Sequence, residues 1–251
     1  MISKKELDTY AKITGLNLGQ AEKDYFQNLL LFVVYQIHGN DIVFKGGTAL
    51  KKCYGLDRFS EDLDFTCAGD IDMEKIENML DRFKVDLTKE SRKYENGLKV
   101  TMKIKGPLYI GVPQSQCRFI IDFSFRENVI LPPAIKTIGR FLEEIPSFDV
   151  FVMQEKEILA EKIRAILSRK KARDVYDLWF LLSKGVEADE ALIEEKFKYY
   201  NQSWDIKEFD RRLGDAESIW VTELRHQVRN LPDFSEAKNL ILKEAKKWSF
   251  Q

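Results

Sequence analysis

The sequence FKGGTAL at residues 44–50 is followed, after a short gap, by RFSEDLDF at residues 58–65. The apolar residues 42–44 predict a buried strand that ends just before the two glycines. Gly46 and Gly47 let backbone N–H groups approach an anion closely at the start of the next helix. This first motif predicts a phosphate-binding turn, although a Gly-Gly pair before a helix is by itself most often only a tight turn.

The second motif places two carboxylates on a predicted strand. Leu63 and Phe65 alternate with Asp62 and Asp64, so the apolar pair enters the core while the acids point to the opposite face. Two carboxylates on one face provide half of a magnesium site, although an Asp-x-Asp alone is commonly a solvated strand edge. The order of strand, Gly-Gly-Thr, helix and acidic strand favours a site that brings a triphosphate against metal-bound oxygens.

The composition predicts a folded, cytoplasmic protein without a membrane segment. Among 251 residues 44% are hydrophobic and 32% are charged, which is typical of a globular chain. The longest apolar run, residues 29–35, is too short to span a bilayer. Cys53, Cys67 and Cys117 lack zinc-finger or Cys-x-x-Cys spacing, so we expect reduced thiols. The net charge of −1 gives no global attraction to nucleic acid.

The periodicity of apolar residues predicts an α+β chain in two domains. Helical spacing occurs at residues 18–37 and 72–92. Strand-like patterns occur at residues 98–104, 118–125 and 148–153, the first two as antiparallel neighbours. From residue 154 onward only helical patterns are found. We therefore predict a domain with a small mixed sheet at residues 1–153 and a helical domain at residues 154–251.

Further candidate site residues lie outside the two motifs. Asp122 stands between the apolar Ile121 and Phe123, and supplies a third carboxylate if its strand lies beside the first acidic strand; otherwise it is an exposed strand position. Lys162 and Arg169 are seven residues apart, hence on nearly one face of a predicted helix. We expect a solvent-facing Lys162 that reaches a triphosphate, although most helix lysines pair with acids on a wet surface.

The remaining polar candidates have structural alternatives. Asp174 fits a helix N-cap as well as a catalytic role, and Asp177 has the spacing of an ordinary ion pair with Arg173. Arg58 and Ser60 are placed to contact phosphate or base. Thr48 caps the glycine-led helix or donates to a phosphate oxygen. One basic cluster supports RNA binding, unless it is only a solvated face: Arg164, Arg169, Lys170, Lys171 and Arg173.

These residues resemble the AbiEii-type nucleotidyltransferases, which are the toxins of type IV toxin–antitoxin pairs within the DNA polymerase β-like superfamily. The resemblance covers about residues 40–182: the motifs at 45–50 and 58–65, Ile121-Asp122-Phe123, LAEKIRA at 159–165 and RDVYDL at 173–178. It implies a polymerase β-like domain followed by a helical domain that completes the active-site cleft. The implied catalytic residues are Asp62, Asp64, Asp122, Lys162 and Asp174, of which the first three also bind metal. The implied nucleotide-binding residues are Gly46, Gly47, Thr48, Arg58, Ser60, Lys162 and Arg169.

The resemblance also implies an activity. The expected enzyme uses two Mg²⁺ ions to move a nucleoside monophosphate from a nucleoside triphosphate to an acceptor, with the tRNA 3′ end favoured. It would act as a toxin whose antitoxin is a separate chain encoded nearby, which need not touch it. The alternatives are transfer to a protein or small molecule, and a nucleotide- or RNA-binding regulator without turnover.

Overall fold

The computed structural model describes residues 1–139, 144–201 and 203–248, and its chain forms two compact units. Unit 1 consists of Met1–Ala49, Glu61–Val129 and Pro133–Val152. Unit 2 consists of Leu50–Ser60, Ile130–Pro132 and Met153–Gln251. Two short segments from the first part of the chain, 50–60 and 130–132, therefore belong with the helices that follow residue 152.

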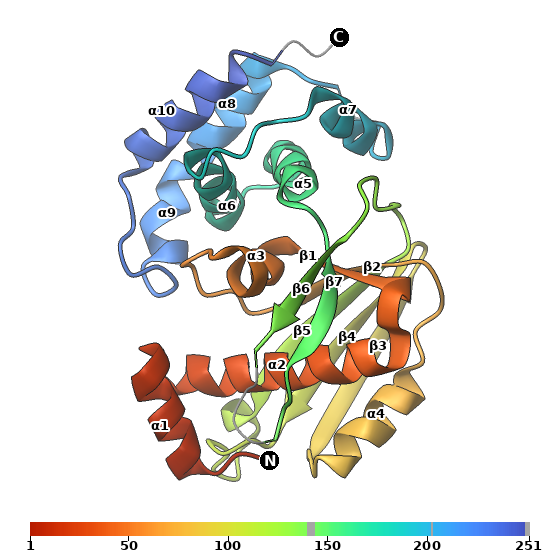
Figure 1. Ribbon diagram of the computed structural model, residues 1–251. Coiled ribbons are helices and arrows are strands. Elements are labelled where there is room, and N and C mark those ends of the chain that lie inside the picture. The colour runs from red at the N-terminus through yellow and green to blue at the C-terminus, as the bar shows by residue number, and fades with distance from the viewer. Residues whose placement is uncertain (140–143, 202, 249–251) are drawn as a thin grey trace. The chain divides into compact units, whose positions relative to one another are not determined.

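Unit 1 is built on a seven-stranded sheet with the order β3-β4-β5-β2-β1-β7-β6 (Figure 1). Its strands are β1 Ile42–Lys45, β2 Leu63–Cys67, β3 Leu87–Tyr94, β4 Gly97–Ile104, β5 Cys117–Ser124, β6 Ala134–Ile138 and β7 Phe148–Val152. The pairs β1–β7 and β2–β5 are parallel and the others antiparallel. The predicted mixed sheet, with antiparallel strands near 98–104 and 118–125, is confirmed.

Three α-helices accompany this sheet: α1 Lys4–Thr14, α2 Leu18–His38 and α4 Met73–Arg82. The helix predicted at residues 18–37 is α2, which begins with a capping box between Asn17 and Gln20. The core of the central strands is aromatic, because Phe65 lies between Phe44 and Phe123, and it stacks on Phe123 with ring centroids 5.4 Å apart.

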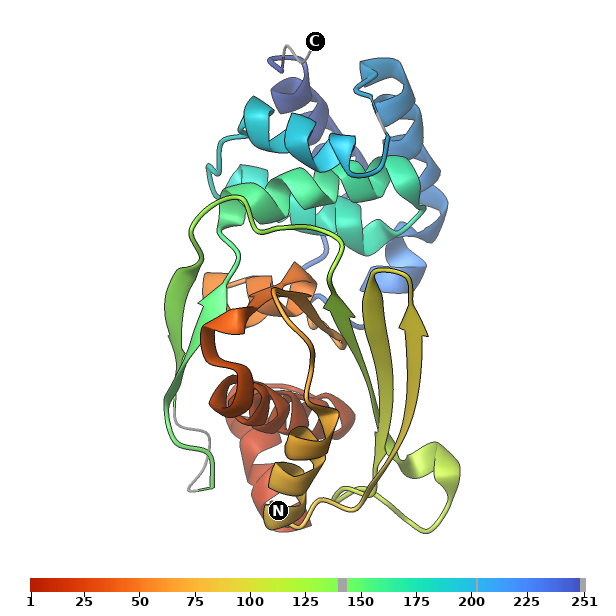
Figure 2. The same ribbon diagram turned by 90° about the vertical axis from the view of Figure 1, so that its right-hand side faces the viewer.

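The helix predicted at residues 72–92 is wrong in its second half. Helix α4 ends at Arg82, Lys84 adopts a left-handed φ of 55°, and the next residues form β3. Strand β3 pairs along its whole length with β4, as a hairpin whose turn is Glu95-Asn96 (Figure 2). The exposed edge strand carries mostly polar residues, so it has no apolar alternation to distinguish it from a helix. The short edge strand β6 was not predicted either, because its apolar residues 134, 135 and 138 do not alternate with polar ones.

Unit 2 is helical. Helix α3, Gly46–Tyr54, begins in unit 1 and ends in unit 2. The other helices of unit 2 are α5 Glu155–Ser168, α6 Ala172–Ser183, α7 Glu190–Lys198, α8 Ile206–Asp215, α9 Glu217–Leu224 and α10 Phe234–Ala245. Leu159, Ile163 and Ile166 of α5 form a buried stripe. The α+β class is confirmed.

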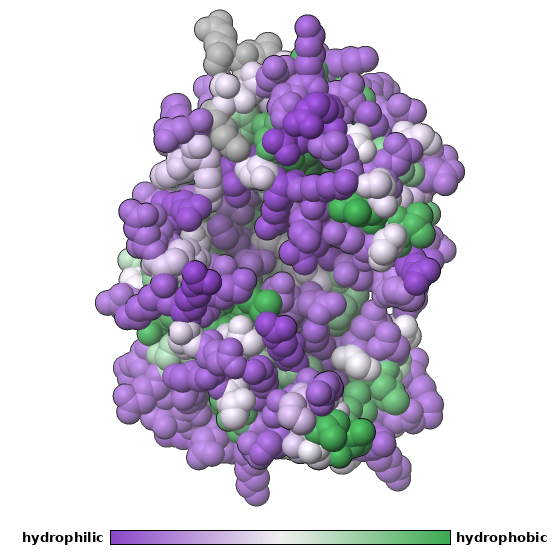
Figure 3. Space-filling view, turned by 180° about the vertical axis from the view of Figure 1, so that it is seen from behind, coloured by the Kyte–Doolittle hydropathy of each residue, from purple (hydrophilic) through white to green (hydrophobic). Residues whose placement is uncertain are grey.

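The surface gives little further indication of function. On the face drawn in Figure 3, hydrophilic residues predominate and hydrophobic residues form separate patches. No helix within the described ranges is long and apolar enough to cross a bilayer. No disulfide joins any of Cys53, Cys67 and Cys117.

Candidate active site

Two of the predicted carboxylates are direct neighbours in the sheet of unit 1. Asp64 on β2 and Asp122 on β5 are paired across the parallel strands, so both side chains leave the same face. Both are half-buried, and the apolar residues that flank them are buried. Asp62 lies one residue before β2 and is also half-buried. The predicted role of Asp122 requires its strand to lie beside the strand of Asp64, and β5 does lie beside β2.

The acids provide part of a metal site but not a closed one. Among the residues described by the structure, no group of three or more His, Cys, Asp or Glu side chains is gathered closely enough to hold a metal ion. Mg²⁺ is usually held by one or two carboxylates together with substrate phosphates and water. The Asp64–Asp122 pair fits that mode, in which the nucleotide completes the coordination.

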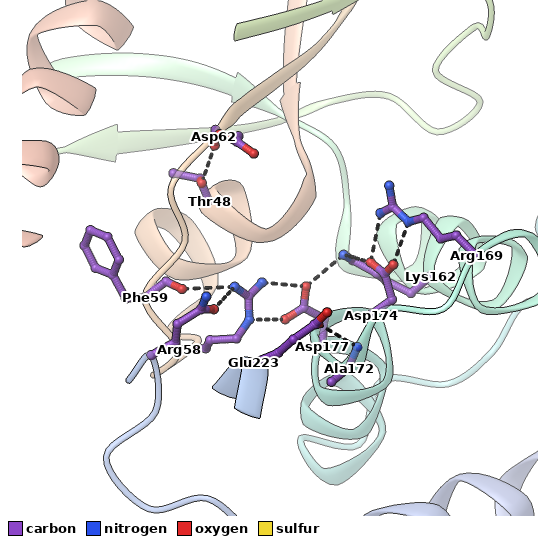
Figure 4. A network of polar contacts seen from close by, with 11 residues as sticks. Thr48, Arg58, Phe59, Asp62, Lys162, Arg169, Ala172, Asp174, Asp177 and Glu223 are labelled. Carbon is purple, nitrogen blue, oxygen red and sulfur yellow. Dashed lines mark hydrogen bonds and ion pairs between the residues drawn. The ribbon is translucent and has the colours of Figure 1, made fainter. Parts of the chain in front are cut away.

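The glycine turn touches this carboxylate pair. Gly46 has a left-handed φ of 75°, and a Cβ added to it would lie 2.6 Å from Oδ2 of Asp64. A side chain at residue 46 would therefore strain the backbone, and it would also collide with the Asp64 carboxylate. The Thr48 hydroxyl donates to the backbone carbonyl of Asp62, which ties the start of α3 to the acidic motif (Figure 4). The nucleotide-binding roles of Gly46, Gly47 and Thr48 stay predictions.

Gly46→Ala is expected to lower nucleotidyl transfer at least tenfold, because it displaces the Asp64 carboxylate. The matched control is Gly55→Ala: Gly55 has a similar φ of 84°, but nothing lies within 4 Å of the added Cβ. Both variants incur about 1–3 kcal/mol of backbone strain. Thermal unfolding and transfer assays separate the two effects, and equal activity in both variants would show that the contact with Asp64 is unimportant.

Asp122 has an unexpected partner, Tyr94. The Tyr94 hydroxyl donates to Oδ1 of Asp122 at 2.5 Å, from the last residue of β3. Gly97, the cross-strand partner of Tyr94, makes room for the ring, since a Cβ there would lie 2.2 Å from Cζ and the hydroxyl oxygen. Burial and the bond to Asp122 raise the pKa of Tyr94, so it remains a donor at neutral pH. Asn96-Gly97, just beyond the end of the predicted helix, is a turn signal that could have indicated this hairpin.

Tyr94→Phe is expected to leave the fold unchanged and to reduce turnover by about tenfold, the cost of one hydrogen bond to a charged group. The loss should appear mainly in kcat and in the Mg²⁺ concentration required for half-maximal rate, while the KM for the nucleoside triphosphate stays near the wild-type value. Gly97→Ala should reproduce the defect, because the new methyl group displaces the same ring. Normal turnover in Tyr94→Phe would make the Asp122 contact incidental.

In unit 2, Lys162 lies in a buried ion network. The prediction that Lys162 faces solvent is wrong. Its Nζ is 2.8 Å from Oδ1 of Asp174 and 2.8 Å from Oδ2 of Asp177 (Figure 4). Lys162 is only 8% exposed, and both aspartates are fully buried. A buried ammonium group requires such partners, which long-range packing of α5 against α6 provides.

Asp174 joins Lys162 to Arg169. The Arg169 Nε donates to Oδ2 of Asp174 at 2.8 Å, and its Nη2 donates to Oδ1 at 3.1 Å. Burial alone would raise the pKa of Asp174, but Lys162 and Arg169 outweigh it and hold that pKa well below its ordinary value. Half of the Arg169 side chain remains exposed, 51%, whereas Lys162 is enclosed.

Asp177 pairs with Arg58, so the expected pair with Arg173 is wrong. Arg58 Nε and Nη2 each donate to a carboxylate oxygen of Asp177 at 2.9 Å. Its Nη1 donates to the Phe59 carbonyl and to Oε1 of Gln227. Arg58 is 2% exposed, and its guanidinium is engaged on every side, while Ser60 is half-buried. Nucleotide binding by either residue stays a prediction.

The basic cluster predicted to favour RNA is largely occupied within unit 2. Arg164 lies over the ring of Tyr200, at 3.8 Å from its centroid. Lys170 donates to the Ser218 hydroxyl at 2.9 Å, and Lys171 is 3.7 Å from a Glu223 oxygen. Arg169 is held by Asp174. Each of these four cations therefore has a partner within unit 2, as is typical of a surface with exposed ion pairs rather than of a phosphate-binding patch.

A mixed sheet with carboxylates on adjacent strands, beside a glycine turn that opens a helix, defines the chain as a nucleotidyltransferase. The family model described as "Nucleotidyl transferase AbiEii toxin, Type IV TA system" matches residues 29–250, and the chain belongs to this family. It is thus a nucleotidyltransferase toxin of the toxin–antitoxin class.

Solved structures share the fold. MenT4, a nucleotidyltransferase toxin of Mycobacterium tuberculosis H37Rv, superposes with a TM-score of 0.63 at 19% identity, over 97% of this chain and 88% of that one. JHP933 of Helicobacter pylori gives a TM-score of 0.54 at 19% identity, over 88% and 89% of the two chains. The uncharacterized protein aq_aa25 of Aquifex aeolicus (strain VF5) is 28% identical over 78% of this chain and 89% of its own length.

Proposed function

We propose that this nucleotidyltransferase transfers a nucleoside monophosphate from a nucleoside triphosphate to the 3′ end of tRNA in a Mg²⁺-dependent reaction. The observation that carries the proposal is the register of Asp64 beside Asp122, with Gly46 against the Asp64 carboxylate. A site of this kind supports in-line displacement, in which position and charge neutralisation provide most of the catalysis.

The residues of unit 1 have separate roles in this proposal. Asp64, Asp122 and Asp62 would hold the metal, and Mg²⁺ when bound neutralises the phosphates and activates the acceptor hydroxyl. The backbone N–H groups at Gly46 and Gly47, at the N-terminus of α3, would bind the triphosphate. Tyr94 holds one oxygen of Asp122 and leaves the other oxygen for the metal.

We propose that the ion network of unit 2 both holds helices α5 and α6 in place and binds phosphate. Arg58, Asp177, Lys162 and Asp174 are buried, and their mutual contacts fix helices α5 and α6. Arg169 is the member with an exposed side chain, so it is the cation of this network that we propose to bind phosphate. Asp174 and Lys162 then act by positioning Arg169.

We propose that the antitoxin is a separate chain encoded nearby. Family membership supports the toxin role, and it leaves transfer to a protein or small molecule as the second candidate. Expression of the toxin alone should arrest growth, and co-expression of the neighbouring gene should relieve the arrest.

One experiment tests the acceptor and the metal together. The protein is incubated with each labelled nucleoside triphosphate, with and without Mg²⁺ and total tRNA, and the RNA, protein and small-molecule products are separated. We expect label in tRNA only when Mg²⁺ is present, and none with Asp64→Asn. Label in protein or in a small molecule would overturn the tRNA assignment, and no label in any fraction would overturn the transfer reaction.

A further inference from the structure

A row of charged residues crosses the sheet of unit 1 on the face of the carboxylate pair. Arg92 on β3 is the cross-strand partner of Lys99 on β4, and Lys99 is the partner of Asp122 on β5. Asp122 is in turn the partner of Asp64 on β2. Directly paired residues project from the same face of a sheet, so the two cations stand beside the acids.

Neither of the two cations has an acid of its own in the part of the chain that the structure describes. Two other lysines of the hairpin are paired, Lys89 with Glu77 and Lys103 with Glu90, whereas Lys93 on the opposite face of β3 also forms no ion pair among the described residues. Arg92 and Lys99 are exposed, and across the described parts of the chain neither one forms an ion pair. Like charges directly opposite one another destabilise a strand pair. A polyanion bound on this face would offset that repulsion.

The order of strands separates this cation pair from the glycine turn. Across the sheet the order β3-β4-β5-β2-β1 gives Arg92, Lys99, Asp122 and Asp64, and then β1, which ends at the glycine turn. Adjacent strands are about 4.8 Å apart, so Lys99 stands one strand and Arg92 two strands from Asp122. In-line displacement requires the leaving pyrophosphate and the acceptor on opposite sides of the reacting phosphorus.

We propose that this face of the β3–β4 hairpin binds the phosphate backbone of the acceptor nucleic acid next to its 3′ end, through Arg92 and Lys99. The proposal rests on transfer to RNA as the proposed function. The triphosphate takes the glycine side of the carboxylates, and the acceptor takes the hairpin side. The ring of Tyr94, 37% exposed on the same face, offers a surface on which a terminal base can stack.

The test compares opposite faces of one strand. The variants are Arg92→Gln, Lys99→Gln and their combination, and the matched control is Lys93→Gln. Lys93 follows Arg92 in sequence, is exposed, and projects from the other face of β3. The charge-conserving pair Arg92→Lys and Lys99→Arg checks that charge is the relevant property, and circular dichroism checks the fold.

The readout is binding of fluorescently labelled total tRNA to the full chain at several salt concentrations, in the absence of triphosphate. The double variant should weaken binding at least tenfold and flatten the slope of log affinity against log salt by about 1.4–1.8 units. Lys93→Gln and the charge-conserving pair should bind like the wild type. Triphosphate affinity, measured separately, should be unchanged in every variant.

The two proposals fail in distinguishable ways. If the wild type labels tRNA but the double variant keeps its salt slope and affinity, the acceptor lies elsewhere and only the hairpin assignment is wrong. If the wild type neither binds nor labels RNA, transfer to RNA itself is wrong. Loss of triphosphate affinity in the double variant would assign the cations to the nucleotide instead.

Discussion

Asp64→Asn is expected to abolish nucleotidyl transfer while the protein folds as the wild type does. The substitution keeps the shape of the side chain against Gly46 but removes the charge that would face a metal ion. Loss of several kcal/mol of charge stabilisation corresponds to at least about a thousandfold decrease in rate. Single-turnover transfer from a labelled triphosphate measures this decrease, and thermal unfolding verifies the fold.

The matched control is Glu61→Gln, in the same motif. Glu61 pairs with Lys23 on the surface, and an exposed ion pair contributes little to stability. Asp62→Asn should behave like Asp64→Asn, whereas Asp122→Asn should retain part of the triphosphate affinity because Asp122 is nearer the acceptor side. A folded Asp64→Asn protein with turnover close to that of Glu61→Gln would contradict the proposed metal site.

The candidate site of unit 1 could be predicted from the sequence because local patterns encode it. Alternation around Asp64 and Asp122 predicts which side chains leave the sheet, and the motif order predicts that the glycine turn precedes the acids. That the two acidic strands are neighbours is a long-range fact, which the resemblance supplied and the register confirms. The polar strand β3, and with it Tyr94, had no periodicity to reveal it.

Burial of charge was the main property that sequence reasoning did not predict. Arg58 and Asp177 are 119 residues apart in the chain, and nothing in their local surroundings indicates that they meet. A helix lysine is ordinarily exposed, so Lys162 was expected in solvent. Its enclosure follows from the positions of two aspartates on α6 and of an arginine in the segment after α3.

Asp177→Asn is expected to destabilise the protein by about 3–5 kcal/mol, the cost of leaving buried charges without their partner. Asp177 is the shared acid of Arg58, 2% exposed, and Lys162, 8% exposed. Burial raises its pKa, but the two cations outweigh burial and lower that pKa, so the charged form is the one that stabilises the fold. The free energy of unfolding at neutral pH, from denaturant titration, measures the loss.

Two further variants separate burial of charge from general damage to α6. Lys171→Gln breaks the exposed pair with Glu223 in the same unit and should cost less than about 1 kcal/mol. Arg58→Met combined with Asp177→Leu removes both charges of the buried pair, and should recover much of the stability lost in Asp177→Asn because no unpaired guanidinium remains. If Asp177→Asn is as mild as Lys171→Gln, the buried ion network does not hold α5 and α6.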